Sequence, residues 1–167
     1  MEKLKKIGLG VEFRLHSVKN ETLDRGMLSI KTNHNAEAVL RNVWPENMHH
    51  KESFFALFLN RSNQLLGYSM INSGCAGCSA VDVKELLALS IMIPGCVALI
   101  VAHNHPGGSK EPSVADRNVT KAIQSLLNYL AIDLLDHLIL LPEKGSVSMR
   151  ELGLVRPIHS ETAPSPG

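Results

Sequence analysis

Residues 97–123 read VALIVAHNHPGGSKEPSVADRNVTKAI, an apolar run followed by a Gly/Pro loop and a helical pattern. His103 and His105 stand where the apolar run ends. In an extended segment, residues i and i+2 point to the same side, so both imidazoles are expected to aim at one point beyond the strand. Ser113 is a suitable N-cap for the helix that follows, and Asp116 falls in its first turn. The stretch therefore predicts a strand, a loop and a helix that bring two imidazoles and a carboxylate together.

This combination of side chains has a recognisable chemistry. Two neutral imidazoles and one carboxylate are a common set of zinc ligands, and three protein ligands leave a fourth position for water, which is typical of a catalytic site. A structural interpretation exists as well. Ser113 and Asp116 resemble a capping box, and the helix dipole favours an acid in the first turn. The complete pattern, with both histidines present, favours the metal site.

Strands are predicted on both sides of this stretch. Residues 52–60 and 64–72 are apolar segments separated by a polar turn, which predicts a β-hairpin. Residues 96–102 form a continuous apolar run, as in a strand buried inside an α/β sheet. Residues 132–142 and 146–149 predict two further strands. Near the N-terminus, residues 10–17 alternate between apolar and polar side chains and predict an edge strand.

Three segments predict helices that cover the sheet. Residues 33–44 predict a short helix with Asn35 as its cap. Residues 80–93 are apolar nearly all round, which predicts a buried helix. The helix that begins near Ser113 is expected to pack on the sheet through Val119, Ala122, Ile123, Leu126, Leu127 and Leu130. Strands alternating with helices indicate an α/β fold, a three-layer sandwich with a mixed β-sheet flanked by helices.

Composition narrows the class of protein. The 167 residues are sufficient for one domain with a hydrophobic core. The formal net charge is +1, so no long-range field would attract nucleic acid. The apolar runs are shorter than the roughly 20 residues that a membrane span needs, and the N-terminus lacks a signal-peptide pattern, so we expect a cytoplasmic protein without membrane contact. Three cysteines argue against a secreted disulfide framework.

The segment HNHPGGSKEPSVAD, the helix beginning RNVT, the later LLDHLIL and the hairpin at 52–74 resemble the JAB/MPN metalloproteases, which carry the JAMM signature. Within that group the resemblance is to the RadC-like bacterial domains, whose sandwich is of the cytidine-deaminase-like type. It covers residues 35–155, where we predict the RadC-like JAB/MPN domain. Residues 1–34 are expected to form an N-terminal extension with the edge strand, and residues 156–167 a disordered tail.

The resemblance implies a zinc-dependent peptidase or isopeptidase with one Zn²⁺ per chain, held by His103, His105 and Asp116. It also implies an upstream glutamate at the mouth of an apolar strand, a place that Glu52 occupies. In such a reaction zinc lowers the pKa of its bound water, and the glutamate takes the proton and passes it to the leaving amine. The metal or Ser113 would stabilise the oxyanion. A solvated charge at the start of a strand is the structural alternative for Glu52.

The sequence also matches two other motifs, those of a nuclease and of a zinc deaminase, but less completely. The letters HNH at 103–105 suggest a nuclease, but that motif is dispersed over a ββα-metal arrangement. A zinc deaminase has His-x-Glu followed by Pro-Cys-x-x-Cys, and His50 to Glu52 with Cys75 and Cys78 imitate it. Glu52 leads into a strand-like segment, however, and no proline precedes Cys75. The same cysteines could form a redox pair, although their Gly-rich loop favours inert small residues.

His137, in LLDHLIL, has two interpretations. It is either a core histidine bonded to the backbone or to Asp136, or a residue that supports the metal site or lines a substrate groove.

A different class of function is a non-catalytic binding or scaffold protein, associated with DNA repair, that retains a zinc site. The presence of all three ligands favours instead an enzyme acting on a peptide or isopeptide substrate. Nucleic acid is a partner that the charge does not support. A homodimer would form if the edge strand at 10–17 paired with a second chain.

Overall fold

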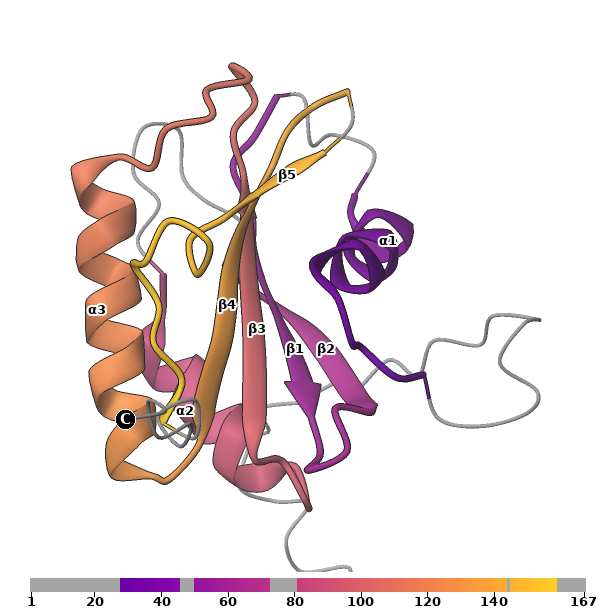
Figure 1. The fold of residues 1–167 in the computed structure, drawn as a ribbon, viewed down its shortest axis with the longest axis vertical. Coiled ribbons are helices and arrows are strands. Elements are labelled where there is room, and N and C mark those ends of the chain that lie inside the picture. Colours follow the sequence, from indigo (N-terminus) through magenta and orange to yellow (C-terminus); the bar gives the residue numbers. More distant parts are fainter. Residues whose placement is uncertain (1–27, 46–49, 73–80, 144, 159–167) are drawn as a thin grey trace, which may run out of the picture.

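The computed structural model of the protein describes residues 28–45, 50–72, 81–143 and 145–158 (Figure 1). In this part of the chain a five-stranded sheet runs through the centre, with α1 on one side of it and α2 and α3 on the other. The elements in chain order are α1 (Asn33–Val43), β1 (Phe54–Leu59), β2 (Leu65–Asn72), α2 (Val83–Met92), β3 (Ala98–Asn104), α3 (Val114–Tyr129), β4 (Asp133–Leu140) and β5 (Ser146–Ser148). The predicted three-layer α/β sandwich is confirmed.

The sheet is mixed, with the strand order β2-β1-β3-β4-β5. β1 is antiparallel to β2 and to β3, and β5 is antiparallel to β4. β3 and β4 are parallel, so the chain must cross over between them, and α3 is that crossover. In the β1/β3 register Phe54 is opposite His103. The start of β1 therefore lies beside the end of β3, where the histidines are.

Alternate side chains of the central strands pack into two cores, as the period-2 geometry of a strand requires. Phe54 and Phe58 of β1 point toward α2 and α3, whereas Phe55 and Leu57 point toward α1. In β3, Leu99 and Val101 share the core with α2 and α3. His103 continues that alternation, so its ring lies on the α3 side of the sheet.

Local capping sets where the helices begin. Thr32, and not Asn35, is the N-cap of α1, so the predicted cap is wrong. The Thr32 hydroxyl accepts a hydrogen bond from the Asn35 amide at 3.2 Å, and Asn35 Oδ1 accepts one from the Thr32 amide at 3.2 Å. Asn35 thus completes a capping box from the third helical position. Asp82 caps α2 by accepting from the amides of Lys84 and Glu85.

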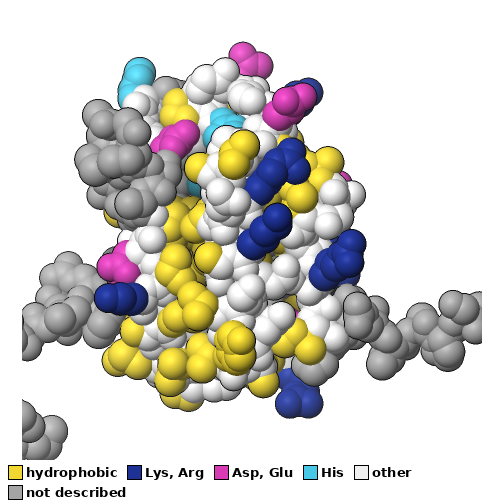
Figure 2. All heavy atoms as spheres, turned by 90° about the vertical axis from the view of Figure 1, so that its left-hand side faces the viewer, with side chains coloured by type: hydrophobic (Ala, Val, Ile, Leu, Met, Phe, Trp, Pro, Cys, Tyr) yellow, Lys and Arg dark blue, Asp and Glu magenta, His cyan; other side chains and the backbone are white. Residues whose placement is uncertain are grey.

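The helices bury narrower faces than their sequences predict. In α2, Ile91 and Met92 are 64% and 59% exposed, so this helix is not buried all round. In α3, Ile123 and Leu127 pack on the sheet as predicted. Three other positions that were expected to pack there are exposed instead: Ala122, Leu126 and Leu130. Each helix meets the sheet along one stripe, and its outer apolar positions face solvent. Figure 2 shows hydrophobic side chains gathered over the lower part of this face.

Several predicted features lie outside the described residues. They are the edge strand at 10–17 with its predicted dimer contact, the loop of Cys75 and Cys78, and most of the tail. The domain boundaries stay predictions. In the described part of the chain, none of the helices combines the length and the hydrophobicity that a membrane crossing needs. Burial raises the pKa of the Cys96 thiol to about 11, which favours its unreactive protonated form.

Candidate metal centre

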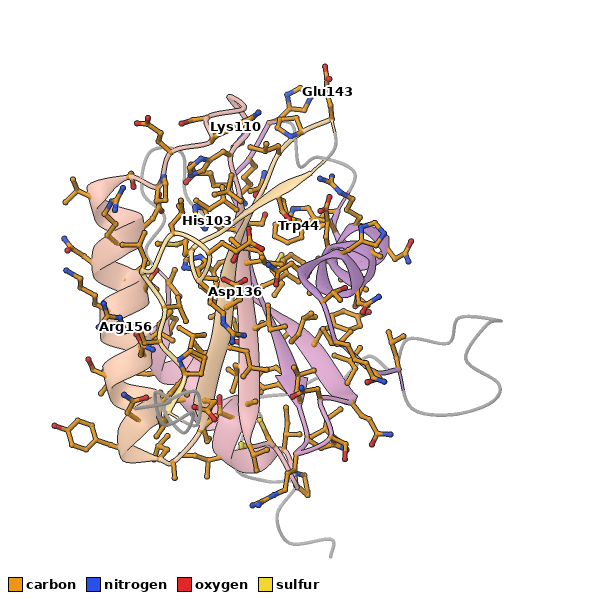
Figure 3. The ribbon with its side chains drawn as sticks, viewed as in Figure 1. Trp44, His103, Lys110, Asp136, Glu143 and Arg156 are labelled. Atoms are coloured by element: carbon orange, nitrogen blue, oxygen red, sulfur yellow. The ribbon has the colours of Figure 1, made fainter. Side chains whose placement is uncertain are left out.

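β3 and the loop after it carry both histidines of the candidate site. His103 lies near the end of β3 and is 4% exposed, and His105 follows the strand directly. Their Nε2 atoms are 3.0 Å apart, so the two rings face one point, as their spacing predicts. In Figure 3, His103 lies between the sheet and the start of α3, below the loop that carries Lys110.

The first turn of α3 brings the carboxylate to the same point. Ser113 Oγ accepts a hydrogen bond from the Asp116 amide at 3.1 Å, and Asp116 Oδ2 accepts one from the Ser113 amide at 2.7 Å. This capping box holds the Asp116 side chain toward the end of β3. Asp116 Oδ1 is 3.2 Å from His103 Nε2, and Oδ2 is 3.5 Å from His105 Nε2. Because the carboxylate has two oxygens, helix capping and metal ligation are compatible.

A hydrogen bond on the outer side of His105 fixes its tautomer. The Ser109 carbonyl oxygen is 2.8 Å from His105 Nδ1. A carbonyl oxygen only accepts, so Nδ1 carries the hydrogen. On the neutral ring, Nε2 then presents its lone pair to His103 and Asp116.

A buried chain of hydrogen bonds fixes His103 in the same way. The Thr120 hydroxyl donates to the backbone carbonyl of Asp116, so its oxygen accepts from His137 Nδ1 at 2.7 Å. His137 Nε2 is left as the acceptor for His103 Nδ1, 2.8 Å away. His137 is fully buried, so water does not compete for these bonds. The Nε2 lone pair of His103 is thereby directed at the site.

Two lone pairs that face each other across 3.0 Å repel unless a cation lies beside them. The ligand atoms of His103, His105 and Asp116 all lie within 4.8 Å of one another. In a tetrahedral site with zinc bonds of about 2.0–2.1 Å, ligand atoms are separated by roughly 3.3 Å. His103 Nε2 is 3.0 Å from His105 Nε2 and 3.2 Å from Asp116 Oδ1, and the 3.5 Å contact of His105 Nε2 is with the other oxygen, Oδ2. The donor atoms and their spacing fit a zinc ion.

The protonation states of Asp116 and His137 suit a cation, whereas at His105 a proton competes with the metal. The hydrogen bond with Asp116 raises the pKa of His105, although burial works against this. Burial would raise the pKa of Asp116, but the hydrogen bonds from His103 and His105 outweigh it and hold that pKa far below its usual value. Burial lowers the pKa of His137 well below 6.5. At neutral pH, Asp116 is therefore ionised and His137 is the neutral ring that the hydrogen-bond chain requires.

Glu52 lies near the site, just before another strand. It is exposed and stands two residues before β1. Phe54 is opposite His103 in the last pair of the antiparallel ladder, and Glu52 precedes Phe54 by two residues, so it lies at the end of the sheet where His105 lies. The negative charge of Glu52 adds to the raised pKa of His105. This location agrees with a base that approaches the metal ligands from a neighbouring strand, and the role itself stays a prediction.

Ser113 is exposed beside Asp116, and its hydroxyl accepts the capping hydrogen bond. Its predicted contact with an oxyanion stays a prediction. His50, the first residue of the deaminase-like pattern, is also exposed.

Comparison with known proteins identifies the group to which this fold and site belong. The family model described as the RadC-like JAB domain matches residues 30–154. The chain belongs to the RadC-like JAB domain family. The resemblance found in the sequence is confirmed.

Relatives of this RadC-like JAB domain carry the name UPF0758 protein. The one from Pelodictyon phaeoclathratiforme is 36% identical over 105 residues, which are 63% of this chain and 46% of that protein. The one from Flavobacterium johnsoniae is 38% identical over 93 residues, 56% of this chain and 40% of that protein. The one from Vibrio cholerae is 35% identical over 102 residues, 61% and 63% of the two chains. The match thus spans less than half the length of the first two relatives.

Three polar residues beside the site of this RadC-like JAB domain were not predicted: Ser109 and Thr120, which bond to His105 and His137, and Asn104, which is buried between the two histidines in sequence. Thr120 follows Asp116 by four residues, which places both on one helix face and is a usable signal. Asn104 interrupts an apolar strand, which is a second signal. The ring of His137 supports His103, whereas Asp136 accepts from the backbone amide of His137 at 2.7 Å. Of the two interpretations of His137, the geometry supports the one that assists the metal site.

Proposed function

We propose that this domain is a zinc-dependent amide hydrolase, a peptidase or isopeptidase, with a peptide or isopeptide as its substrate. His103, His105 and Asp116 hold the metal, and Glu52 is the general base. The observation that carries the proposal is the convergence of three ligand atoms within 4.8 Å of one another, next to a carboxylate whose charge acts on His105.

Zinc held by these residues would supply a Lewis acid and a water that is acidic near neutral pH. Glu52 takes a proton from the attacking water and returns it to the leaving nitrogen. Its exposed position before β1 lets the carboxylate meet a substrate that arrives from solvent.

Ser113 and Phe54 complete the proposed machinery. The Ser113 hydroxyl accepts from the Asp116 amide at 3.1 Å, so its own hydrogen can be donated to the oxyanion of the tetrahedral intermediate. The ring of Phe54 lies 5.4 Å from that of His137, between centroids, and 6.4 Å from that of His103. This apolar wall lowers the local dielectric, which strengthens the electrostatic interactions of the site.

Glu52→Gln tests this function in zinc-loaded protein purified without a histidine tag. The probes are a library of internally quenched peptides and a peptide linked through a lysine side chain. We expect the variant to keep its fold and zinc, because Glu52 is neither a ligand nor buried, while hydrolysis falls by about 10²-fold or more. His103→Ala should lose both zinc and hydrolysis. Glu143→Gln, which alters an exposed glutamate in the turn after β4, is the matched control and should keep both.

Two results would contradict the proposal. Unchanged hydrolysis in zinc-loaded Glu52→Gln would remove Glu52 from the mechanism. A wild-type protein that cleaves no probe but binds duplex DNA, with an affinity that falls steeply with salt concentration, would favour the non-catalytic binding function instead.

A further inference from the structure

The side chain of Asn104 is hydrogen-bonded to the backbone on both sides of Glu52. Asn104 Oδ1 accepts a hydrogen bond from the Ser53 amide at 2.8 Å, and Asn104 Nδ2 donates to the Lys51 carbonyl at 2.9 Å. These backbone groups belong to the residues immediately before and after Glu52. One amide side chain therefore fixes the main chain on both sides of the proposed base.

Glu52 lies beyond the end of the β1/β3 ladder. The ladder between β1 and β3 ends at the pair Phe54 and His103. Beyond that pair β3 follows β4, and the His105 amide donates to the Leu140 carbonyl at 3.0 Å. At this end of the sheet, the Asn104 side chain adds two hydrogen bonds to the backbone on either side of Glu52.

The chemistry of the clamp requires an amide. It needs one acceptor and one donor on the same planar group, which asparagine offers and a carboxylate or an aliphatic side chain does not. Asn104 is 1% exposed and Ser53 is 5% exposed, so the bond between them is buried, whereas the bond to the Lys51 carbonyl is partly buried. Asn104 also lies between His103 and His105, so the clamp ties the segment of Glu52 to the strand that carries two of the metal ligands.

We propose that Asn104 is a positioning residue that holds Glu52 at a fixed place relative to His103 and His105. This inference rests on the proposed function, because it gives Asn104 its role through Glu52. In a hydrolase, misplacement of a base by about 1 Å can cost on the order of 10²-fold in rate. Asn104 contributes in this way without touching the substrate or the metal.

The test compares Asn104→Ala with Asn60→Ala. Asn60 is the matched control because its side chain organises the turn at the other end of β1, accepting from the amides of Ser62 and Gln64. Asn104→Leu, which keeps the volume without the amide, is the second variant if Asn104→Ala is poorly folded. All are studied in the full chain loaded with zinc.

Four results are expected. The Ser53 amide exchanges its hydrogen faster in Asn104→Ala but not in Asn60→Ala. Zinc affinity, measured by competition with a chelator, stays within about threefold of the wild type because no ligand or ring support is touched. With the best-cleaved peptide of the quenched library, kcat falls by about 10²-fold and KM changes little. The double variant Glu52→Gln with Asn104→Ala is no slower than Glu52→Gln, since Asn104 acts through that carboxylate.

Additive losses in the double variant, or unchanged Ser53 exchange in Asn104→Ala, would overturn the proposal. If the wild type cleaves no probe, the proposed function is contradicted, but the role of Asn104 can still be tested. Crystal structures of the zinc-loaded wild type and Asn104→Ala then show whether Asn104 holds Glu52 in place. Displacement of Glu52 from His105 in Asn104→Ala would support it. The same Glu52 position in both proteins would overturn it.

Discussion

His103 Nδ1 lies 2.8 Å from His137 Nε2, and this contact joins the parallel strands β3 and β4 through their side chains. Both rings are buried, at 4% and 0% exposure, so neither can exchange its partner for water. The direction of the metal-facing nitrogen of His103 therefore depends on the protonation of His137. That in turn depends on Thr120, a fully buried residue whose hydroxyl is hydrogen-bonded both to His137 and to the backbone carbonyl of Asp116.

Thr120→Val should weaken zinc binding, because it removes the oxygen that fixes the tautomer of His137 while keeping the side-chain volume. Losing a direct hydrogen-bond partner of a metal ligand typically lowers metal affinity by about 10–100-fold, and Thr120 acts one bond further out through His137, so we expect a loss near the lower limit. The unpaired His137 Nδ1 should also lower the free energy of unfolding of the metal-free protein by about 1–3 kcal/mol. Chelator competition and urea unfolding measure the two effects. Thr120→Ser retains the hydroxyl and should be close to the wild type in both, and an equal loss in Thr120→Ser would contradict the tautomer argument.

His103→Ala should abolish zinc binding, since it removes a ligand and the nitrogen that faces His105. Elemental analysis of tag-free protein should give about one zinc per chain for the wild type and almost none for the variant. His50→Ala removes an exposed histidine from the turn before β1 and should bind as the wild type does. Equal zinc content in the two variants would mean that the metal binds elsewhere.

Metal-free protein should lose stability as the pH rises above 6.5 because of His105. Its folded-state pKa is raised above 6.5 by the hydrogen bond with Asp116, so the folded protein keeps a proton that the unfolded chain releases. That contribution is full below pH 6.5 and is lost as the pH rises through the raised pKa. The pKa of Asp116 is lowered, so its carboxylate stays ionised throughout this range.

Urea unfolding with a chelator present, at several pH values, measures this effect. The difference in free energy of unfolding between the wild type and His105→Gln should shrink as the pH rises. Adding zinc should reverse the trend, because the metal competes with protons for His105. A difference that grows with pH in metal-free protein would contradict the assigned pKa shift.

Arg41→Ala should destabilise the fold without affecting the metal site. Arg41 Nη2 donates to the carbonyls of Leu141 and Gly145 at 3.1 and 2.8 Å, and its Nε donates to Glu37 at 2.7 Å. These bonds fasten the turn between β4 and β5 to α1. Hydrogen bonds to a charged group contribute about 1.5–3 kcal/mol each at most, so we expect a loss of that order in the free energy of unfolding. Zinc stoichiometry should not change, and a parallel loss of zinc would show that the turn and the site are coupled.

The convergence of His103, His105 and Asp116 could be predicted from the sequence because two local rules bring them together. The i, i+2 spacing on a strand brings the histidines together, and the capping box turns Asp116 back toward the strand end. The order of the layers followed from alternating strands and helices in the same way. These features depend on short stretches of chain, which sequence patterns describe well.

The supporting residues could not be predicted, because their partners come from distant elements. Asn104 bonds residues more than fifty positions earlier in the chain, and His137 bonds His103 from the neighbouring strand. The pattern also predicts burial of several apolar positions in α2 and α3 that are exposed in the structure, for a related reason. Periodicity shows that Leu126 and Ile123 lie on one apolar arc, but only tertiary packing decides which part of the arc meets the sheet.

All the proposed ligands, together with Thr120 and His137, come from Ala98–Leu140, the single unit β3-α3-β4, whereas Glu52 comes from the hairpin before it. Different segments of the chain therefore carry the proposed metal ligands and the proposed base, so one can be lost while the other is kept. On this proposal, substitution of Glu52 alone would leave a folded protein that binds the metal but does not catalyse hydrolysis. If Glu52 is the base, metal content is a poor guide to activity among relatives with this architecture, and the residue two positions before β1 is the one to examine.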